Sequence, residues 1–178
     1  YFGWKTYELA FDNFRVEAAD MIGEEGHAFY YATSGLETAR AHTAARAIGL
    51  AQGALDDSIK YAGDRKQFGR SISEFQAIRF KIAEMATQIE AARLLTYNAA
   101  RLRDDGLPFV KESAMAKLFA SRAAERVASK AIEVHGGYGF TREYPIEKYF
   151  RDQKVGQIYE GTTNMQLLVI AKQILGKM

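Results

Sequence analysis

Apolar side chains recur at helical spacing along most of the chain between about Leu36 and Val134. The clearest series steps by three or four residues: Phe75, Ile78, Ile82, Met85, Ile89 and Ala92. A seam with this spacing packs against other helices at shallow crossing angles. The same stretch is rich in Ala, Leu, Ile, Arg and Glu, all of which favour helices. The pattern therefore predicts a bundle of helices.

Glycines, prolines and small polar residues mark where these helices are expected to begin and end. The expected boundaries are Gly63–Asp64, Ser73 as an N-cap, Asp104–Gly106, Pro108, His135–Gly136, Pro145, Gly156, and Thr162 or Thr163. The expected core positions are Leu36, Ile48, Leu55 and Ile59 in the first helix, and Met115, Leu118, Phe119, Val127 and Val134 in the third. The predicted fold is mainly α, an antiparallel up-down-up-down four-helix bundle over residues 25–178 with a short N-terminal β segment.

The N-terminal β segment is the exception to the helical pattern. Within Thr6–Phe11 the apolar side chains alternate with other residues, which is the period of a strand. Asp12-Asn13 predicts a turn, and Phe14–Val16 is a candidate second strand. Because a lone hairpin is only marginally stable in water, we interpret residues 1–24 as the remnant of a larger β domain. The first residue is Tyr1 rather than Met, and we expect the chain to begin inside a larger protein.

Composition excludes several classes of protein. Apolar residues make up 48% of the 178 residues and charged residues 26%, as in an ordinary globular domain. The net charge of +2 gives no strong field for nucleic acid or a membrane surface. No apolar run approaches the roughly 18 residues of a membrane span. With no cysteines, disulfides and thiolate metal sites are excluded.

A metal site is not expected either. The 3 histidines are scattered through the sequence. Glu24 and His27 have the Glu-x-x-His spacing that di-iron bundles use twice, but here it occurs once and contains Gly26.

Two segments are candidates for phosphate binding, each with a simpler alternative. The glycines of His135-Gly136-Gly137-Tyr138-Gly139 would let backbone N–H groups approach a phosphate, or they simply stop a helix. The loop Arg65–Arg70 places three cations around Phe68. Arginine pairs well with phosphate and an aromatic ring packs against a planar ligand, but cations also favour a helix C-terminus.

Glu160 is the candidate for acid–base chemistry. It lies in Ile158-Tyr159-Glu160-Gly161-Thr162, just before an expected helix and beside apolar neighbours. A partly desolvated carboxylate facing a cleft suits a general base. The alternative is a negative charge that stabilises the helix N-terminus through its dipole. The residues alone leave both open.

Taken together, these segments resemble the acyl-CoA dehydrogenase family from about Tyr7 to the C-terminus. They occur in the family's order: Phe11-Asp12-Asn13-Phe14-Arg15-Val16, Gly49-Leu50-Ala51-Gln52, Arg65-Lys66-Gln67-Phe68-Gly69 with Gln76, His135-Gly136-Gly137-Tyr138-Gly139, and Ile158-Tyr159-Glu160-Gly161-Thr162. Family members have an N-terminal helical domain, a middle β domain and a C-terminal four-helix bundle, with FAD between the last two. The resemblance implies that residues 1–24 end the middle domain and that residues 25–178 form the bundle.

The resemblance also implies the ligands and partners. It implies FAD contacts from Arg65, Gln67, Phe68 and Gln76 across a subunit boundary, from Gly136 and Gly137 near the pyrophosphate, and from Thr162 and Asn164 within the same subunit. It implies substrate contacts from Arg40, Tyr159 and Gly161. The implied protein is a homodimer or homotetramer that oxidises an acyl-CoA and passes electrons to an electron-transfer flavoprotein. Its implied location is the bacterial cytoplasm, with the mitochondrial matrix as the alternative.

In this family Glu160 would remove the α proton of the thioester while a hydride leaves the β carbon for the flavin. Some members take the base from the first helix, where this chain has Ala39. Three residues depart from the family pattern: Glu133 for Gln beside the expected pyrophosphate, Leu167 for Arg, and Glu17 for Pro. Glu133 would repel the pyrophosphate, which puts that contact in question.

Two other functions stay open at this point. One is a flavin oxidase or monooxygenase of the same fold, against which Glu160 argues. The other is a catalytically silent helical assembly module, because the chain alone lacks most of the implied flavin and acyl pocket. We expect the isolated chain to be inactive.

Overall fold

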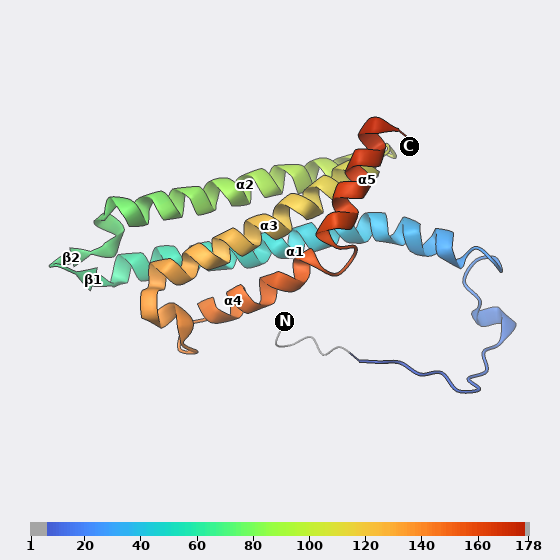
Figure 1. The fold of residues 1–178 in the computed structure, drawn as a ribbon, viewed down its shortest axis with the longest axis horizontal. Coiled ribbons are helices and arrows are strands. Elements are labelled where there is room, and N and C mark those ends of the chain that lie inside the picture. The colour runs from blue at the N-terminus through green and yellow to red at the C-terminus, as the bar shows by residue number, and fades with distance from the viewer. Residues whose placement is uncertain (1–6, 177–178) are drawn as a thin grey trace.

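The computed structural model describes residues 7–176 of the chain. Along these residues the α-helices are α1 (Ala28–Asp64), α2 (Gln76–Asp104), α3 (Val110–His135), α4 (Ile146–Gln153) and α5 (Thr163–Leu175). Figure 1 shows α1, α2 and α3 side by side, each running opposite to the one before it. The short α4 then runs back along α1 and α3. The predicted antiparallel up-down-up-down bundle is therefore confirmed.

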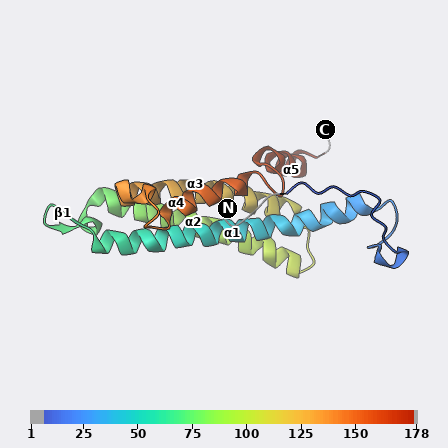
Figure 2. The ribbon, with the colours of Figure 1, turned by 90° about the horizontal axis from the view of Figure 1, so that it is seen from below.

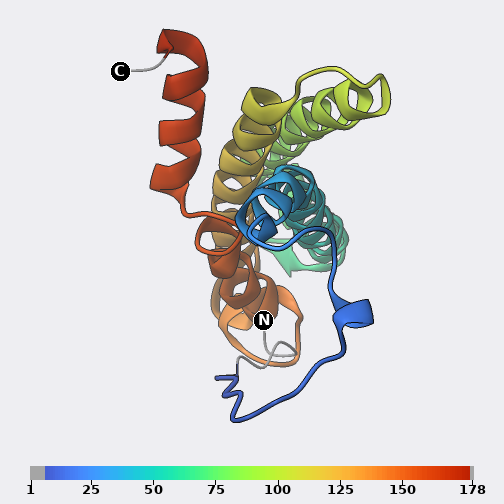
Figure 3. The same cartoon turned by 90° about the vertical axis from the view of Figure 1, so that its right-hand side faces the viewer.

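Helix α5 leaves this bundle. It packs mainly on α3, and Figures 2 and 3 show it standing away from the other helices. Its first residue follows Thr162, whose Oγ1 accepts a hydrogen bond from the backbone N–H of Met165 at 3.4 Å. Thr162 is thus the N-cap of α5, which is one of the two residues predicted for this role. The loop before α5 carries Glu160. The start of this helix therefore fixes one end of the loop that holds the candidate base.

The two short strands of the described residues join α1 to α2. Strand β1 (Lys66–Gln67) pairs with β2 (Arg70–Ser71) in antiparallel register, with Gln67 opposite Arg70. Phe68 and Gly69 both have positive φ, 50° and 79°, which is the conformation of a tight two-residue hairpin turn. The prediction of Ser73 as the N-cap of the next long helix was wrong, because Ser73 lies in the short helix Ile72–Glu74 and Phe75 is the N-cap of α2. Ser71 caps the short helix by accepting from the Ser73 N–H.

The predicted N-terminal strands are not formed in the described residues. Thr6 lies outside these residues, and Tyr7–Val16 contains no strand. The side chains of Tyr7, Leu9 and Phe11 are 70–76% exposed. The physical reason is that an alternating pattern needs a neighbouring strand and an apolar surface to cover, and this segment has neither. Its separate-domain assignment, residues 1–24, stays a prediction.

The core of the bundle is built largely from alanine. Buried alanines include Ala44, Ala47, Ala51 and Ala54 of α1, Ala92 and Ala99 of α2, and Ala116, Ala120, Ala123, Ala124 and Ala131 of α3. Larger buried members are Leu55, Met85, Ile89, Val127 and Ile146. Small side chains let helix axes approach closely. The prediction was wrong for Leu36 and Ile59, which are 37% and 51% exposed.

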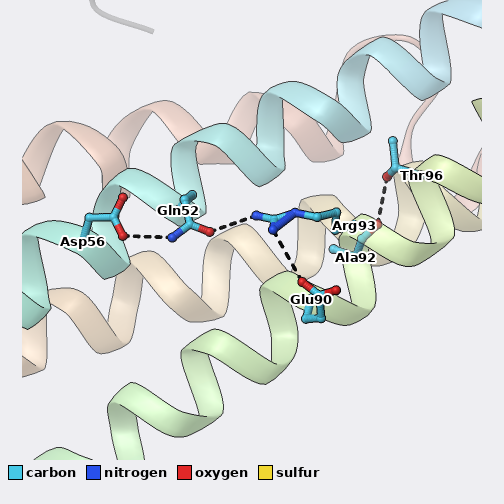
Figure 4. Close-up of polar contacts among 6 residues, drawn as sticks. All are labelled: Gln52, Asp56, Glu90, Ala92, Arg93 and Thr96. Carbon is cyan, nitrogen blue, oxygen red and sulfur yellow. Dashed lines mark hydrogen bonds and ion pairs between the residues drawn. The ribbon is translucent and has the colours of Figure 1, made fainter.

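A polar chain ties α1 to α2 outside this core (Figure 4). The guanidinium of Arg93 donates to the Gln52 side chain at 2.9 Å, and the Gln52 amide donates to Asp56 at 2.9 Å. Arg93 also lies 3.4 Å from Glu90. These contacts fix the register of the two helices where the alanine faces meet.

Candidate functional site

The loop between α4 and α5 holds the candidate base in an unusual backbone conformation. Glu160 has φ 55° and Gly161 has φ 91°, so two successive residues are left-handed. This conformation is unfavourable for a residue with a Cβ, by about 1–2 kcal/mol for Glu160. At Gly161 a Cβ would lie 2.7 Å from Nε2 of Gln166. The positive φ therefore favours glycine at 161, and other contacts must hold Glu160.

Two buried donors hold the carbonyl groups of this turn. Gln166 Nε2 donates to the Gly161 carbonyl at 2.8 Å and lies 3.3 Å from the Glu160 carbonyl. Lys117 Nζ of α3 donates to the same Gly161 carbonyl. Gln166 and Lys117 are each only 1% exposed. The turn that presents Glu160 is thus tied to both α3 and α5.

Two charged groups of opposite sign, Arg40 and Glu160, act on the ammonium group of Lys117. Burial lowers its pKa from 10.5 to about 8, the Glu160 carboxylate acts in the opposite direction, and Arg40 adds to the lowering. Arg40 comes from α1, and its Nε is buried with no hydrogen-bond partner in the described part of the chain. The structure therefore brings the predicted residues Arg40, Glu160 and Gly161 together around Lys117, which the sequence analysis did not single out.

The remaining predicted residues of this region lie on either side of Glu160. Tyr159 is partly buried, and its backbone N–H donates to the Val155 carbonyl at 3.1 Å. Thr162 and Asn164 are exposed at the start of α5. Their exposure leaves them available to a ligand, which the family resemblance implies is FAD.

The predicted phosphate-binding residues meet at the other end of the bundle. Arg65, Gln67, Gly136 and Gly137 line one cleft of about 450 Å³. The guanidinium carbon of Arg65 lies 5.6 Å from the centre of the Tyr138 ring. A Cβ at Gly136 or Gly137 would meet nothing within 4 Å, so the backbone there is open to close approach. An arginine beside open glycine backbone is suited to bind a phosphate group.

Phe68 and Gln76 lie outside the lining of that cleft. Phe68, at the turn between β1 and β2, is 93% exposed, and its ring meets Phe75 edge-on at 6.2 Å between centroids. Gln76 is exposed at the first position of α2. Both are therefore placed to contact a molecule that approaches the hairpin from outside the chain.

Glu133 lines the same cleft, but its charge is compensated. Its carboxylate pairs with the ammonium of Lys81 on α2. From the sequence alone Glu133 had no identified partner, and it was expected to repel a pyrophosphate. The pairing reduces that repulsion, because the two opposite charges lie in contact at the edge of the cleft.

The two groups of predicted residues are far apart. Arg40 and Arg65 are both carried by α1 or its C-cap, 25 residues apart, which at 1.5 Å per residue is about 37 Å along the helix. A single flavin ring cannot contact both groups. Each group must serve a different part of a ligand or a different ligand molecule.

The sequence contains only a weak signal for the burial of Lys117. The buried positions of α3 include Ser113, Ala116, Lys117, Ala120 and Ala124, which recur at helical spacing. A lysine inside such a stripe is rarely buried without a partner. The absence of large apolar side chains in this stripe concealed its inward orientation.

Comparison with known proteins places the chain in a family. The family model described as "Acyl-CoA dehydrogenase, C-terminal domain" matches residues 26–175, and the chain belongs to this family. It is 53% identical over 170 residues to the probable short/branched chain specific acyl-CoA dehydrogenase of Dictyostelium discoideum, covering 96% of this chain and 41% of that protein. It is 45% identical over 175 residues to the caffeyl-CoA reductase-Etf complex subunit CarC of Acetobacterium woodii, covering 98% and 46%.

A solved structure agrees. Butyryl-CoA dehydrogenase from Megasphaera elsdenii matches with a TM-score of 0.88 and 46% identity, over 90% of this chain and 42% of that one. The fold and the family are thus established. The chain spans less than half the length of these relatives, 41%, 46% and 42%.

Among residues 7–176, no group of three or more His, Cys, Asp or Glu side chains could hold a metal ion. In the same range, no helix is both long and apolar enough to cross a membrane.

Proposed function

We propose that this chain is the C-terminal part of an FAD-dependent acyl-CoA dehydrogenase in which Glu160 is the catalytic base. The observation that carries the proposal is the turn at Glu160, which is anchored by buried donors from α3 and α5, one of which, Lys117, also interacts with the charge of Arg40. Membership of the family supports the same assignment. A carboxylate on an anchored turn is in a defined place relative to a substrate, as general base catalysis requires.

The proposed reaction removes two hydrogens from the acyl group. The Glu160 carboxylate takes the α proton of the thioester, the electron pair of that C–H bond forms the Cα=Cβ double bond, and a hydride leaves the β carbon. Bound FAD would accept this hydride and so take up the two electrons. The backbone N–H of Glu160 would donate to the thioester oxygen, where negative charge develops. Tyr159 and Gly161 would line the acyl group, and Arg40 would lie towards CoA.

The residues present fit an FAD molecule with two separate sets of contacts. The open backbone at Gly136 and Gly137, together with Arg65 and Gln67, fits a diphosphate. The exposed Phe68 ring and the Gln76 side chain extend that surface.

Thr162 and Asn164 lie by contrast next to the base, in the group of residues that includes Arg40, and Arg40 and Arg65 are about 37 Å apart along α1. This separation supports a cofactor shared between subunits. One set would contact the FAD of its own subunit and the other the FAD of a neighbour.

The proposed assembly is a homodimer or homotetramer. Several large apolar side chains are at least 53% exposed: Phe68, Phe80, Leu94, Tyr97, Leu168, Ile174 and Leu175. Surfaces of this kind are usually covered in closed symmetric oligomers. An electron-transfer flavoprotein is the proposed electron acceptor, supported by the name of the Acetobacterium relative. The proposed compartment is the cytoplasm, with the mitochondrial matrix as the alternative.

A silent assembly module is the second candidate, but for the isolated chain only. Binding sites bury most of their ligand, and residues 7–176 alone leave both sets of FAD contacts open on one side. The isolated chain should therefore carry no flavin absorbance after purification. A flavin oxidase or monooxygenase of the same fold is disfavoured, because the turn presents a glutamate suited to α-proton removal.

The test is Glu160→Gln in the flavin-loaded enzyme of which this chain is proposed to be a part. The variant should keep its fold and FAD, and flavin reduction by acyl-CoA should fall by about 10²–10⁴-fold, the usual effect of removing a positioned base. Glu90→Gln is the matched control, because Glu90 pairs with Arg93 on the surface of α2. Flavin reduction by Glu160→Gln at the wild-type rate would disprove the assignment.

A further inference from the structure

Lys117 is a buried ammonium group for which the proposed reaction has no direct use. It projects from α3 and is 1% exposed, among buried neighbours that are mostly alanine and serine. Burying a charge is unfavourable unless it is paired and hydrogen-bonded. Methionine or leucine would fill the same space without that penalty. A lysine here must therefore be explained by what its Nζ contacts.

Those contacts all belong to the turn of the base. Nζ donates to the Gly161 carbonyl, and the nearest opposing charge is the Glu160 carboxylate. The same carbonyl accepts from Gln166 Nε2 at 2.8 Å. Two donors from two helices thus converge on one peptide group, directly after the left-handed Glu160. Without them, the turn would relax towards a conformation that suits a residue with a Cβ.

The two charged groups around Lys117 act on it in opposite ways. Arg40 from α1 and Glu160 from the loop are the charged groups that act on it. Arg40 disfavours the ammonium form and Glu160 favours it. The Glu160 carboxylate therefore interacts with an ammonium that is itself hydrogen-bonded to the next residue of the turn. This arrangement restrains the position of Glu160 by charge as well as by hydrogen bonds.

We propose that Lys117 is a positioning residue for the catalytic base, which fixes the left-handed turn through the Gly161 carbonyl and restrains the Glu160 carboxylate by its charge. The proposal rests on the proposed role of Glu160. A purely structural role for Lys117 would instead affect stability alone. The two roles differ in a measurable way, because positioning acts on proton removal and leaves substrate affinity largely unchanged.

The test compares variants of the flavin-loaded enzyme. Lys117→Met keeps the length and apolar stem but removes the donor and the charge. We expect FAD content and melting temperature close to the wild type, because the lost hydrogen bond is offset by removal of a buried charge. Flavin reduction at saturating acyl-CoA should fall by about 10–100-fold, the effect of a small displacement of a reacting group. Exchange of the α proton with solvent deuterium should fall by the same factor, with KM little changed.

Lys130→Met is the matched control. Lys130 lies on the same helix, about 20 Å further along, and pairs with Glu84 on the surface. It should react at the wild-type rate. Lys117→Gln, a second substitution that removes the charge at the same position, decides the matter if Lys117→Met does not fold. Its α-proton exchange should also fall.

The outcomes separate the two proposals. Wild-type α-proton exchange in Lys117→Met, or in Lys117→Gln if that is the variant that folds, overturns the positioning role while Glu160→Gln is inactive. If Glu160→Gln itself keeps wild-type activity, the proposed function fails, and the role of Lys117 fails with it.

Discussion

Tyr61 of α1 and His135 of α3 are stacked, with ring centroids 4.2 Å apart and ring planes inclined by 24°. His135 Nδ1 lies 2.9 Å from the Ala131 carbonyl, which can only accept a hydrogen bond. The proton of the neutral imidazole is therefore on Nδ1. His135 Nε2 is buried and has no partner among residues 7–176. Tyr144 meets both rings, at 5.4 Å and 5.5 Å between centroids.

This environment predicts a pH dependence of stability. Burial lowers the pKa of His135 below 6.5, although the Ala131 hydrogen bond and Asp57 act in the opposite direction. Between the lowered pKa and 6.5 the unfolded chain binds more protons than the folded chain, so the free energy of unfolding rises with pH. Acidification through 6.5 should therefore destabilise the fold, and this contribution should level off below the lowered pKa.

The measurement is denaturant unfolding between pH 5 and pH 7.5 for the wild type and His135→Gln. Glutamine can still donate to the Ala131 carbonyl but does not titrate in this range. As the pH falls, the unfolding free energy of the wild type should decrease more than that of the variant. Parallel curves for the two proteins would show that His135 contributes nothing to the pH dependence.

Two glycines predict opposite effects of the same substitution. At Gly139 a Cβ would lie 2.9 Å from both the Cα and the carbonyl oxygen of Ile132, which are backbone atoms and cannot move aside easily. Gly139→Ala should destabilise the protein by about 1–3 kcal/mol. At Gly49, inside α1, a Cβ would meet nothing within 4 Å. Gly49→Ala should stabilise by about 0.5–1 kcal/mol through lower chain entropy.

Thermal or denaturant unfolding of the two variants checks this prediction. The pair is informative because the change in composition is identical and only the surroundings differ. A stable Gly139→Ala would mean that the short helix Gly136–Phe140 can shift away from α3. Such a shift would also change the cleft lined by Gly136 and Gly137.

The sequence predicted the helix ends better than the helix faces. Gly106 and Gly136 end α2 and α3 in left-handed conformations, which glycine adopts freely, so local chemistry was sufficient. The faces depend on tertiary packing. Leu36 and Ile59 were expected inside, but the bundle buries alanines such as Ala44 and Ala51, which let the helices approach closely. A sequence with large apolar residues on one side and alanines on another does not reveal which side faces the bundle.

The sequence predicted individual residues of the candidate site but not the contacts between them. Glu160 was found through its motif, and Arg40 through the family resemblance. Lys117 was missed because a lysine is ordinarily expected at the surface. The pairing of Glu133 with Lys81 joins residues 52 positions apart. Only the fold brings such residues together, so a sequence by itself shows Glu133 as an uncompensated charge.

The Lys81–Glu133 pair leads to a prediction about FAD affinity. Glu133 lines the cleft that also holds Arg65 and Gly136, where we propose that the diphosphate binds. The side chains of Lys81 and Glu133 are 30% and 52% exposed, so solvent screens the pair and its effect is modest. Removing the ammonium exposes the diphosphate to the carboxylate, whereas removing the carboxylate frees the ammonium to attract it.

Lys81→Met should therefore weaken FAD binding by about 2–5-fold, corresponding to up to roughly 1 kcal/mol for a partly exposed charge. Glu133→Gln should tighten binding by a similar factor, and the double variant should lie close to the wild type because the net charge is restored. Flavin titration of the apoenzyme measures all three, and the differences should shrink with added salt. Lys130→Met is the control, because Lys130 and Glu84 bridge the same two helices away from this cleft. Equal losses in Lys81→Met and Lys130→Met would mean that only the overall charge matters, and that Glu133 does not face the bound diphosphate.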